Sequence, residues 1–190
     1  MSAVSRLRRL FEKFGCEGTP QPQVPSAHPL AAILVTFMSH ESRLAELGIV
    51  LPTPPPAAGA YVPAVRTGNL LYLAGTLPMK DGKVASLGKV GREIDLAQAA
   101  EAARLCTLNS LANAKAALGS LDKVVRVVMV NGFVNGIDGF SDSPKVLNGA
   151  SEFLLQVFGD AGKHARAAVS VNGLPLGVSV EVQMVLEVRD

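Results

Sequence analysis

Hydrophobic positions recur along this chain with two periods, one typical of helices and one typical of strands. Helical spacing predicts two helices, at residues 95–118 and 143–158, with Asp95 as the N-cap of the first and Gly119 as its stop. Valine-rich or alternating stretches predict strands at residues 61–65, 70–75, 121–134, 166–171 and 178–188. The order β-β-α-β-α-β-β indicates an α+β sandwich, with both helices packed on one face of a sheet.

The last two predicted strands alternate polar and apolar side chains. Residues two apart in a strand share a face, so Arg166, Ala168 and Ser170 lie on one side. We expect the opposite set to be buried in the core: Ala167, Val169 and Val171. In the final strand, Glu181 and Gln183 share a face. The face of the sheet without helices carries many small and β-branched residues, and a second copy of the chain is the simplest partner to cover it.

The first part of the chain differs in composition from the rest. Eight of the 12 prolines fall between Pro20 and Pro56. We therefore separate residues 1–50, an N-terminal extension with a proline-rich linker that is partly disordered or helical, from residues 51–190, the folded domain. The basic pattern of residues 5–14 suggests organelle targeting by residues 1–37, and the alternative is that translation starts at Met38. Without targeting, we expect a cytoplasmic protein.

Charge and composition argue against several kinds of partner. The net charge is +2, and residues 1–37 account for it with four basic and two acidic residues, so the rest of the chain is neutral. Without a basic cluster we expect no nucleic-acid binding. The apolar run at residues 30–38 is too short to span a bilayer, so we expect no membrane partner. Two cysteines and three scattered histidines predict neither a disulfide framework nor a metal site.

Familiar catalytic signatures are missing from the sequence. It contains no G-x-S-x-G motif, no phosphate loop and no dinucleotide fingerprint, so we expect no cofactor. An enzyme built from this chain has to use few polar groups and backbone atoms. The informative segment is residues 164–183, where Arg166 heads one strand face beside alanines.

Three stretches within residues 56–190 resemble the Rid family, also called RidA-like or YjgF-like and formerly described as endoribonuclease L-PSP. They are PAAGAYVPAV with GNLLYLAG, VVRVVMVNGF with LNGASEFL, and ARAAVSVNGLPLGVSVEV. The resemblance implies a chorismate-mutase-like mixed β-sheet and a homotrimer with clefts between its subunits. It also implies hydrolytic deamination of reactive 2-imino and 2-enamino acids, such as 2-aminoacrylate and 2-iminopropanoate, to 2-keto acids and ammonia.

Four positions of the family's active site match in this sequence, namely Tyr61, Gly75, Asn148 and Arg166. The resemblance implies that these residues contact the substrate. Arginine is the critical match, because a guanidinium is permanently charged and binds a carboxylate through two parallel hydrogen bonds. An imine next to a carboxylate is already electrophilic, so the enzyme mainly has to position it and present water.

Three positions depart from the family pattern: Ala74 stands where Ser is usual, Ala168 where Cys is usual and Gln183 where Glu is usual. The backbone of Ala168 can still hold the imine nitrogen and water without a thiol. The amide of Gln183 cannot act as a general base, so it orients water, or Glu181 on the same strand face takes its place.

Alternatives to a deaminase follow from these departures. One is a non-catalytic module of the same trimeric fold that binds small carboxylates such as 2-keto acids. Another is RNA cleavage, which the neutral domain argues against. Taken alone, Arg166 is more typical of a surface ion pair, Glu181 of a partner for a lysine or arginine, and Asn148 of a helix cap.

Overall fold

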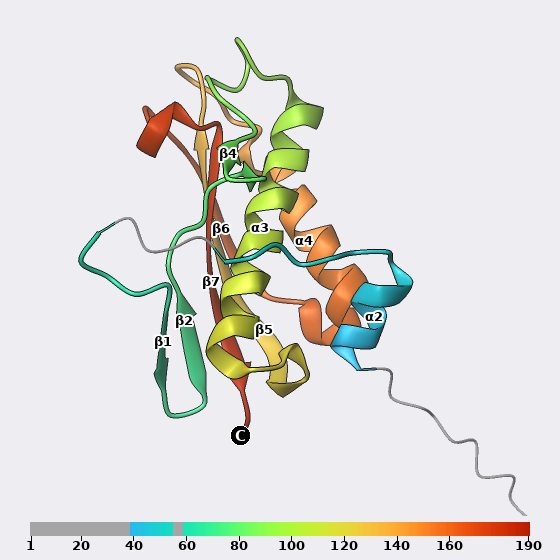
Figure 1. The fold of residues 1–190 in the computed structure, drawn as a ribbon. Helices are drawn as coiled ribbons and strands as arrows, with labels where there is room; N and C mark the ends of the chain where they lie inside the picture. Colours follow the sequence, from blue (N-terminus) through green and yellow to red (C-terminus); the bar gives the residue numbers. More distant parts are fainter. Residues whose placement is uncertain (1–38, 55–58) are drawn as a thin grey trace, which may run out of the picture. The chain divides into compact units, whose positions relative to one another are not determined.

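A five-stranded mixed sheet is the framework of the molecule (Figure 1). The computed structural model describes residues 39–54 and 59–190. The strands lie in the order β1-β2-β7-β5-β6, and β5 and β6 are parallel while the other neighbours are antiparallel. Their bounds are Ala64–Thr67 for β1, Leu70–Leu73 for β2, Val124–Asn135 for β5, Ala165–Val171 for β6 and Val180–Val188 for β7. A turn at Asp81-Gly82 joins β3 (Met79–Lys80) to β4 (Lys83–Val84).

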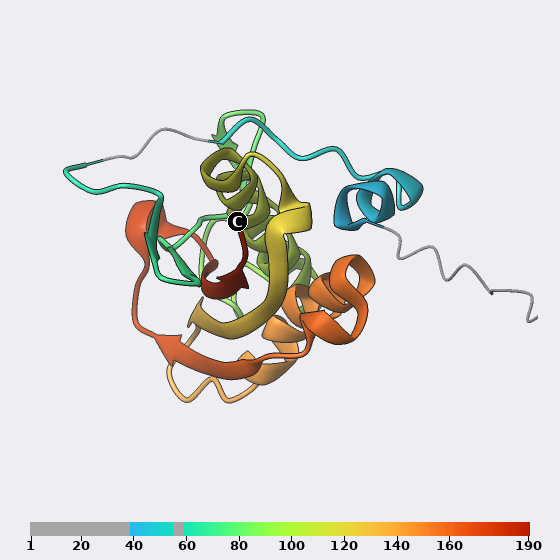
Figure 2. The ribbon, with the colours of Figure 1, turned by 90° about the horizontal axis from the view of Figure 1, so that it is seen from below.

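The two predicted helices are present and cover one face of the sheet (Figure 2). Helix α3 runs Leu96–Leu118 and begins with a capping box at Asp95, and Gly119 ends it in the left-handed conformation. Helix α4 runs Ser143–Phe158. The two helices pack closely because Gly149 has no side chain, and a Cβ there would collide with the carbonyl oxygen of Ala100. The α+β prediction is confirmed.

A third helix, α2 (His40–Glu46), lies within the stretch predicted to be an extension. Its Glu41 carboxylate accepts hydrogen bonds from Lys115 Nζ at 2.7 Å, Ser120 Oγ at 2.8 Å and the Leu121 amide at 3.0 Å. The His40 ring packs edge-on against Phe158, with the ring centroids 4.7 Å apart. These contacts attach α2 to the domain. Residues 1–38, including the predicted targeting segment, lie outside the described residues.

The hydrophobic core lies between the sheet and α3 and α4. Every second residue of β7 points into it. The buried residues of that strand are Val180, Val182, Met184, Leu186 and Val188. Strand β5 contributes Val127, Val130 and Val134, and the helices contribute large side chains such as Leu111, Leu147 and Phe153. Burying aliphatic side chains on one face of the sheet gives the main favourable term in folding.

Strand β6 has the opposite orientation to the one predicted. Its register pairs Arg166 with Val130 and Ala168 with Gly132, and Val130 is fully buried. Arg166 and Ala168 therefore lie on the helix side of the sheet, because paired residues point to the same face. Val169 is 46% exposed. The prediction that Ala167, Val169 and Val171 form the core is wrong, because alternation separates two faces without showing which of them the helices cover.

Candidate functional site

Arg166 is held at the edge of the sheet by two side chains of α4. Its Nη1 donates hydrogen bonds to Asn148 Oδ1 and to Ser151 Oγ, each at 3.0 Å. Asn148 and Ser151 are three residues apart and so share one face of α4. Arg166 and Asn148, which were each predicted to contact the substrate, are thus in direct contact with one another. Ser151 is a further partner of Arg166 that sequence reasoning missed.

The remaining donors of Arg166 are open to solvent. Both hydrogens of Nη1 are engaged, whereas within residues 39–54 and 59–190 no hydrogen bond uses Nε or Nη2. These two nitrogens form the side-on edge of the guanidinium, the geometry that matches the two oxygens of a carboxylate. In the described part of the chain no carboxylate forms a salt bridge with Arg166. The guanidinium therefore carries a charge that no described carboxylate neutralises, and its Nε and Nη2 are left to donate to a ligand.

Behind Ser151 lies His164, in the turn that leads into β6. Its Nε2 is 3.1 Å from Ser151 Oγ, and its Nδ1 is 2.6 Å from the carbonyl oxygen of Gly162. Burial lowers the pKa of His164, and the charge of Arg166 lowers it further, against the opposing effect of the hydrogen bond to Gly162. The balance of these effects favours the neutral imidazole.

A second polar group lies on β7 and the segment after β2. The Glu181 carboxylate lies directly against Gly75, where a Cβ would collide with Glu181 Oε1. Burial raises the pKa of Glu181. Two residues along the strand, Gln183 Oε1 is 3.5 Å from Asn131 Nδ2 of β5. Asn131 is a further polar neighbour that the sequence did not reveal.

The two groups lie on different faces of the sheet. Glu181 pairs with Phe133 and Gln183 with Asn131, on the face without helices, whereas Arg166 pairs with the buried Val130 on the helix side. A single chain therefore does not bring Arg166 together with Glu181 and Gln183 around one small molecule.

The remaining two predicted residues are divided between these regions. The Ala168 side chain packs against the core on the helix side. Tyr61 precedes β1 and is 53% exposed, at the opposite end of the sheet order from β6. The predicted site residues thus occupy separate parts of one subunit, and Arg166 with Asn148, and Gly75 with Glu181, are the pairs in contact.

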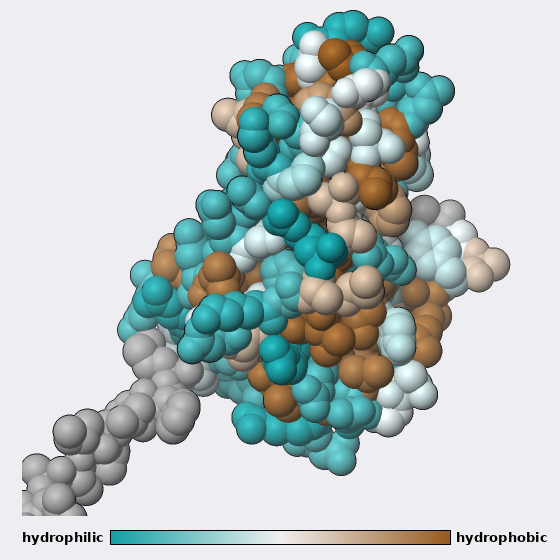
Figure 3. Space-filling view, turned by 180° about the vertical axis from the view of Figure 1, so that it is seen from behind, coloured by the Kyte–Doolittle hydropathy of each residue, from teal (hydrophilic) through white to brown (hydrophobic). Residues whose placement is uncertain are grey.

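Hydrophobic residues remain exposed on the face of the sheet without helices. The view from behind shows apolar residues gathered among hydrophilic ones (Figure 3). Exposed apolar residues of the sheet include Val65, Tyr72, Met129 and Val169, each more than a third exposed. A cluster of exposed apolar side chains is typical of a surface that contacts another protein.

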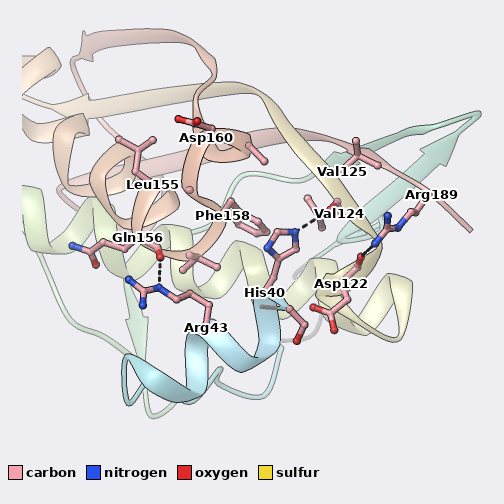
Figure 4. Close-up of a pocket in the computed structure, with 14 residues that line it drawn as sticks. His40, Arg43, Asp122, Val124, Val125, Leu155, Gln156, Phe158, Asp160 and Arg189 are labelled. Carbon is pink, nitrogen blue, oxygen red and sulfur yellow. Dashed lines mark hydrogen bonds between the residues drawn. The ribbon is translucent and has the colours of Figure 1, made fainter. Parts of the chain in front are cut away.

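A hollow of about 770 Å³ lies elsewhere, between α2, the start of β5 and the end of α4 (Figure 4). His40, Arg43 and Arg189 line it together with Asp122 and apolar side chains. Its polar groups are already engaged: His40 Nε2 lies 3.2 Å from the Val124 carbonyl oxygen, and Arg43 Nε donates to that of Gln156 at 3.0 Å. None of the predicted site residues lines this hollow.

Two kinds of feature are not found in the part of the chain that the structure describes. No group of three or more His, Cys, Asp or Glu side chains could hold a metal ion there. No helix among these residues is long and apolar enough to cross a bilayer.

Residues 41–188 match the sequence profile of the family described as "YjgF/chorismate mutase-like, putative endoribonuclease". The chain belongs to the YjgF/RidA-like family. The match begins inside α2 and ends at the last residue of β7. The predicted family and its fold are therefore confirmed.

The similarity extends over almost the whole length of several known proteins. Protein TCP17 of Trypanosoma cruzi is 41% identical over 150 residues, which cover 78% of this chain and 94% of TCP17. The structure of protein Atu1372 of Agrobacterium tumefaciens, of unknown function, is 47% identical with a TM-score of 0.74 and covers 79% of this chain and 92% of that one. RidA of an Antarctic Psychrobacter species is 30% identical with a TM-score of 0.51 and covers 72% of this chain and 94% of that one.

Proposed function

We propose that this YjgF/RidA-like protein is a hydrolytic deaminase of 2-imino and 2-enamino acids. The observation that carries the proposal is the free edge of Arg166, whose Nη1 is fully engaged by two neutral oxygens. A guanidinium fixed in this way holds a carboxylate in one orientation. Membership of the family and the similarity to RidA support a small imino acid as the molecule that carries the carboxylate.

The reaction requires little from the protein beyond position and one proton acceptor. Water adds to the carbon of the protonated imine, and the water loses a proton as the new C–O bond forms. The resulting amino alcohol then releases ammonia as the C–N bond breaks, which leaves the 2-keto acid. Glu181 is the residue suited to accept the proton, because burial raises its pKa above that of an ordinary glutamate and makes it a stronger base. Gln183 beside it orients the water through its amide.

Arg166 lies on the helix side of the sheet, and Glu181 and Gln183 lie on the other face. This placement supports a site shared between copies of the chain. We propose a homotrimer in which Arg166, Asn148 and the Ala168 backbone of one subunit face Glu181 and Gln183 of the next. Gly75 lies against Glu181, and Tyr61 belongs to the same half of the site. The exposed apolar residues of the sheet support burial of this surface in an assembly.

The direct test couples an amino-acid oxidase to the purified protein and follows decay of the imino acid that the oxidase forms. The wild-type protein is expected to accelerate decay, and Arg166→Ala to remove at least about 99% of the acceleration, since two charge-assisted hydrogen bonds are lost. Arg43→Ala is the matched control, because Arg43 is an exposed arginine that pairs with Glu46 on α2. If wild type and Arg166→Ala leave the decay rate equally unchanged, the enzyme assignment is wrong.

A second candidate function is a binding module for 2-keto acids on the same trimeric fold. Gln183 favours it, because an amide cannot accept a proton. Calorimetry with 2-oxobutanoate separates the two: binding that requires Arg166, without acceleration of imine decay, identifies a module rather than an enzyme.

The expected location follows from the same proposal. A detoxifying hydrolase of soluble metabolites needs neither a membrane nor a nucleic acid as partner, and we propose that it acts in the cytoplasm unless residues 1–37 direct it to an organelle.

A further inference from the structure

A chain of three hydrogen-bonded groups leads from Arg166 into the protein. The Gly162 carbonyl oxygen can only accept, so His164 Nδ1, 2.6 Å away, carries a hydrogen. A neutral imidazole has one N–H, so Nε2 is an acceptor and the Ser151 hydroxyl, at 3.1 Å, donates to it. The hydrogen of Ser151 is thereby committed. Its oxygen is left to accept from Arg166 Nη1.

We infer that Ser151 and His164 are positioning residues for the Arg166 guanidinium and turn its Nε–Nη2 edge toward the incoming carboxylate. The inference rests on the proposed function, because it assumes that Arg166 binds the substrate. Asn148 takes one hydrogen of Nη1 and Ser151 takes the other. The plane of the guanidinium is then fixed by two points on one helix face.

Positioning matters here because Arg166 is exposed at the sheet edge. A long arginine side chain that moves freely loses conformational entropy when it binds a ligand, and this loss weakens binding. Holding Nη1 in advance removes most of that loss. Ser151 alone could donate or accept in several directions, and His164 restricts it to one of them. Neither residue needs to touch the substrate.

The charge of Arg166 also links ligand binding to the protonation of His164. Lys163 is adjacent in sequence, and Arg126 of β5 and Glu187 of β7 line the same hollow of about 580 Å³ as His164. Of these neighbours, Arg166 is the one that lowers the pKa of His164 through its charge. A carboxylate bound to Arg166 offsets that charge, so the pKa of His164 should rise on binding. By linkage, carboxylate binding should tighten as the pH falls through that pKa.

Three variants test the positioning role with 2-oxobutanoate as the probe. Ser151→Ala is expected to weaken its binding about three- to tenfold, the effect of losing one ordinary hydrogen bond, because Ser151 acts on the ligand only through Arg166. It should raise KM for the imino acid by a similar factor and leave kcat unchanged. Ser151→Thr keeps the hydroxyl and should restore wild-type affinity. His164→Phe removes the acceptor of that hydroxyl and should weaken binding less than Ser151→Ala.

Nuclear magnetic resonance titration of the histidine ring protons provides a readout that a merely structural role would not move. Saturating 2-oxobutanoate should raise the pKa of His164, because the bound carboxylate offsets the charge of Arg166. The inference is overturned if Ser151→Ala and His164→Phe both bind the probe as tightly as wild type does. It is also overturned if the pKa of His164 is the same with and without the bound probe. A wild-type protein that does not bind 2-oxobutanoate overturns the proposed function itself.

Discussion

Glu181 occupies the space beside Gly75 that a side chain at position 75 would fill. The glycine backbone is in the ordinary range of φ there, so space rather than backbone conformation requires a glycine. The carboxylate is thus held against the backbone that follows β2 and directed along the open face of the sheet.

Gly75→Ala should displace the Glu181 carboxylate and reduce the rate of imine hydrolysis about tenfold or more, because a general base is effective only in hydrogen-bonding reach of its proton. Gly173→Ala is the matched control, since nothing lies within 4 Å of a Cβ there. Steady-state kinetics of both variants check the prediction. Equal rates for Gly75→Ala and Gly173→Ala would show that the position of Glu181 does not matter for catalysis.

Glu181→Gln should remove the acidic limb of the kcat/KM profile. The side chain must be ionised to accept a proton, and burial raises its pKa, so wild-type activity should fall on acidification at a higher pH than for an exposed glutamate. Gln183→Glu is the companion variant and should raise activity if a missing base limits the rate. An unchanged pH profile in Glu181→Gln would assign the base to another group.

The same substitution predicts a change in stability. A carboxyl with a raised folded pKa contributes stability that is fully present below its unfolded pKa and is lost as pH rises through the folded value. Wild type should therefore lose stability relative to Glu181→Gln as the pH rises above about 4, since that window starts near the ordinary glutamate pKa. Thermal unfolding of both proteins across this range measures the difference, and a constant difference would contradict it.

A shared site predicts complementation between two inactive variants. Arg166→Ala and Glu181→Ala subunits each lack one half of the site, and a mixed ring places an intact Arg166 beside an intact Glu181 in some interfaces. Random mixing in a cyclic trimer should restore about a quarter of the wild-type sites. Co-expression with two affinity tags, followed by the imine assay, measures this recovery. No recovery in verified mixed trimers would place both residues in one subunit's site.

Glu41→Gln should destabilise the fold by about 1 kcal/mol at neutral pH, since one charge-assisted bond is weakened. The hydrogen bond from Lys115 is the main cause that lowers the pKa of Glu41, with Ser120 next. The contribution of the Glu41 carboxylate to the free energy of unfolding is present above the pKa that Glu41 has in the unfolded chain. It is lost as the pH falls through the lower pKa that Glu41 has in the folded protein. The difference from wild type should therefore shrink in acid below about pH 4. Glu46→Gln, an exposed pair with Arg43, is the control and should change stability little.

The local pattern of the sequence was sufficient for the helices and for most of the strands. Capping at Asp95 and Gly119 has a local cause, and the structure reproduces both ends of that helix. Helix α4 has the predicted bounds, and Asp142 precedes its first turn. Short-range chemistry therefore sets the ends of these two helices to within about a residue, whereas the predicted strand ends differ by up to three residues.

Relations between distant segments could not be predicted in the same way. The orientation of β6 depends on its parallel pairing with β5 and on the crossover through α4, which alternation within residues 166–171 does not encode. The contacts of Ser151 with Arg166 and of Glu181 with Gly75 likewise join elements that are remote in sequence. The resemblance to a family named the site residues, whereas their division between two faces of the sheet required the structure.

The parallel pairing of β5 and β6 has a further consequence for how such a protein can change over evolution. Arg166, Asn148 and Ser151 all belong to one β-α-β unit, whereas Glu181 and Gly75 belong to the antiparallel half of the sheet. In the proposed deaminase, recognition of the acid and the chemistry performed on it are therefore encoded in separable parts of the chain. A substitution in one part can alter turnover and leave the choice of ligand class intact, which is the kind of change that the amide at position 183 represents.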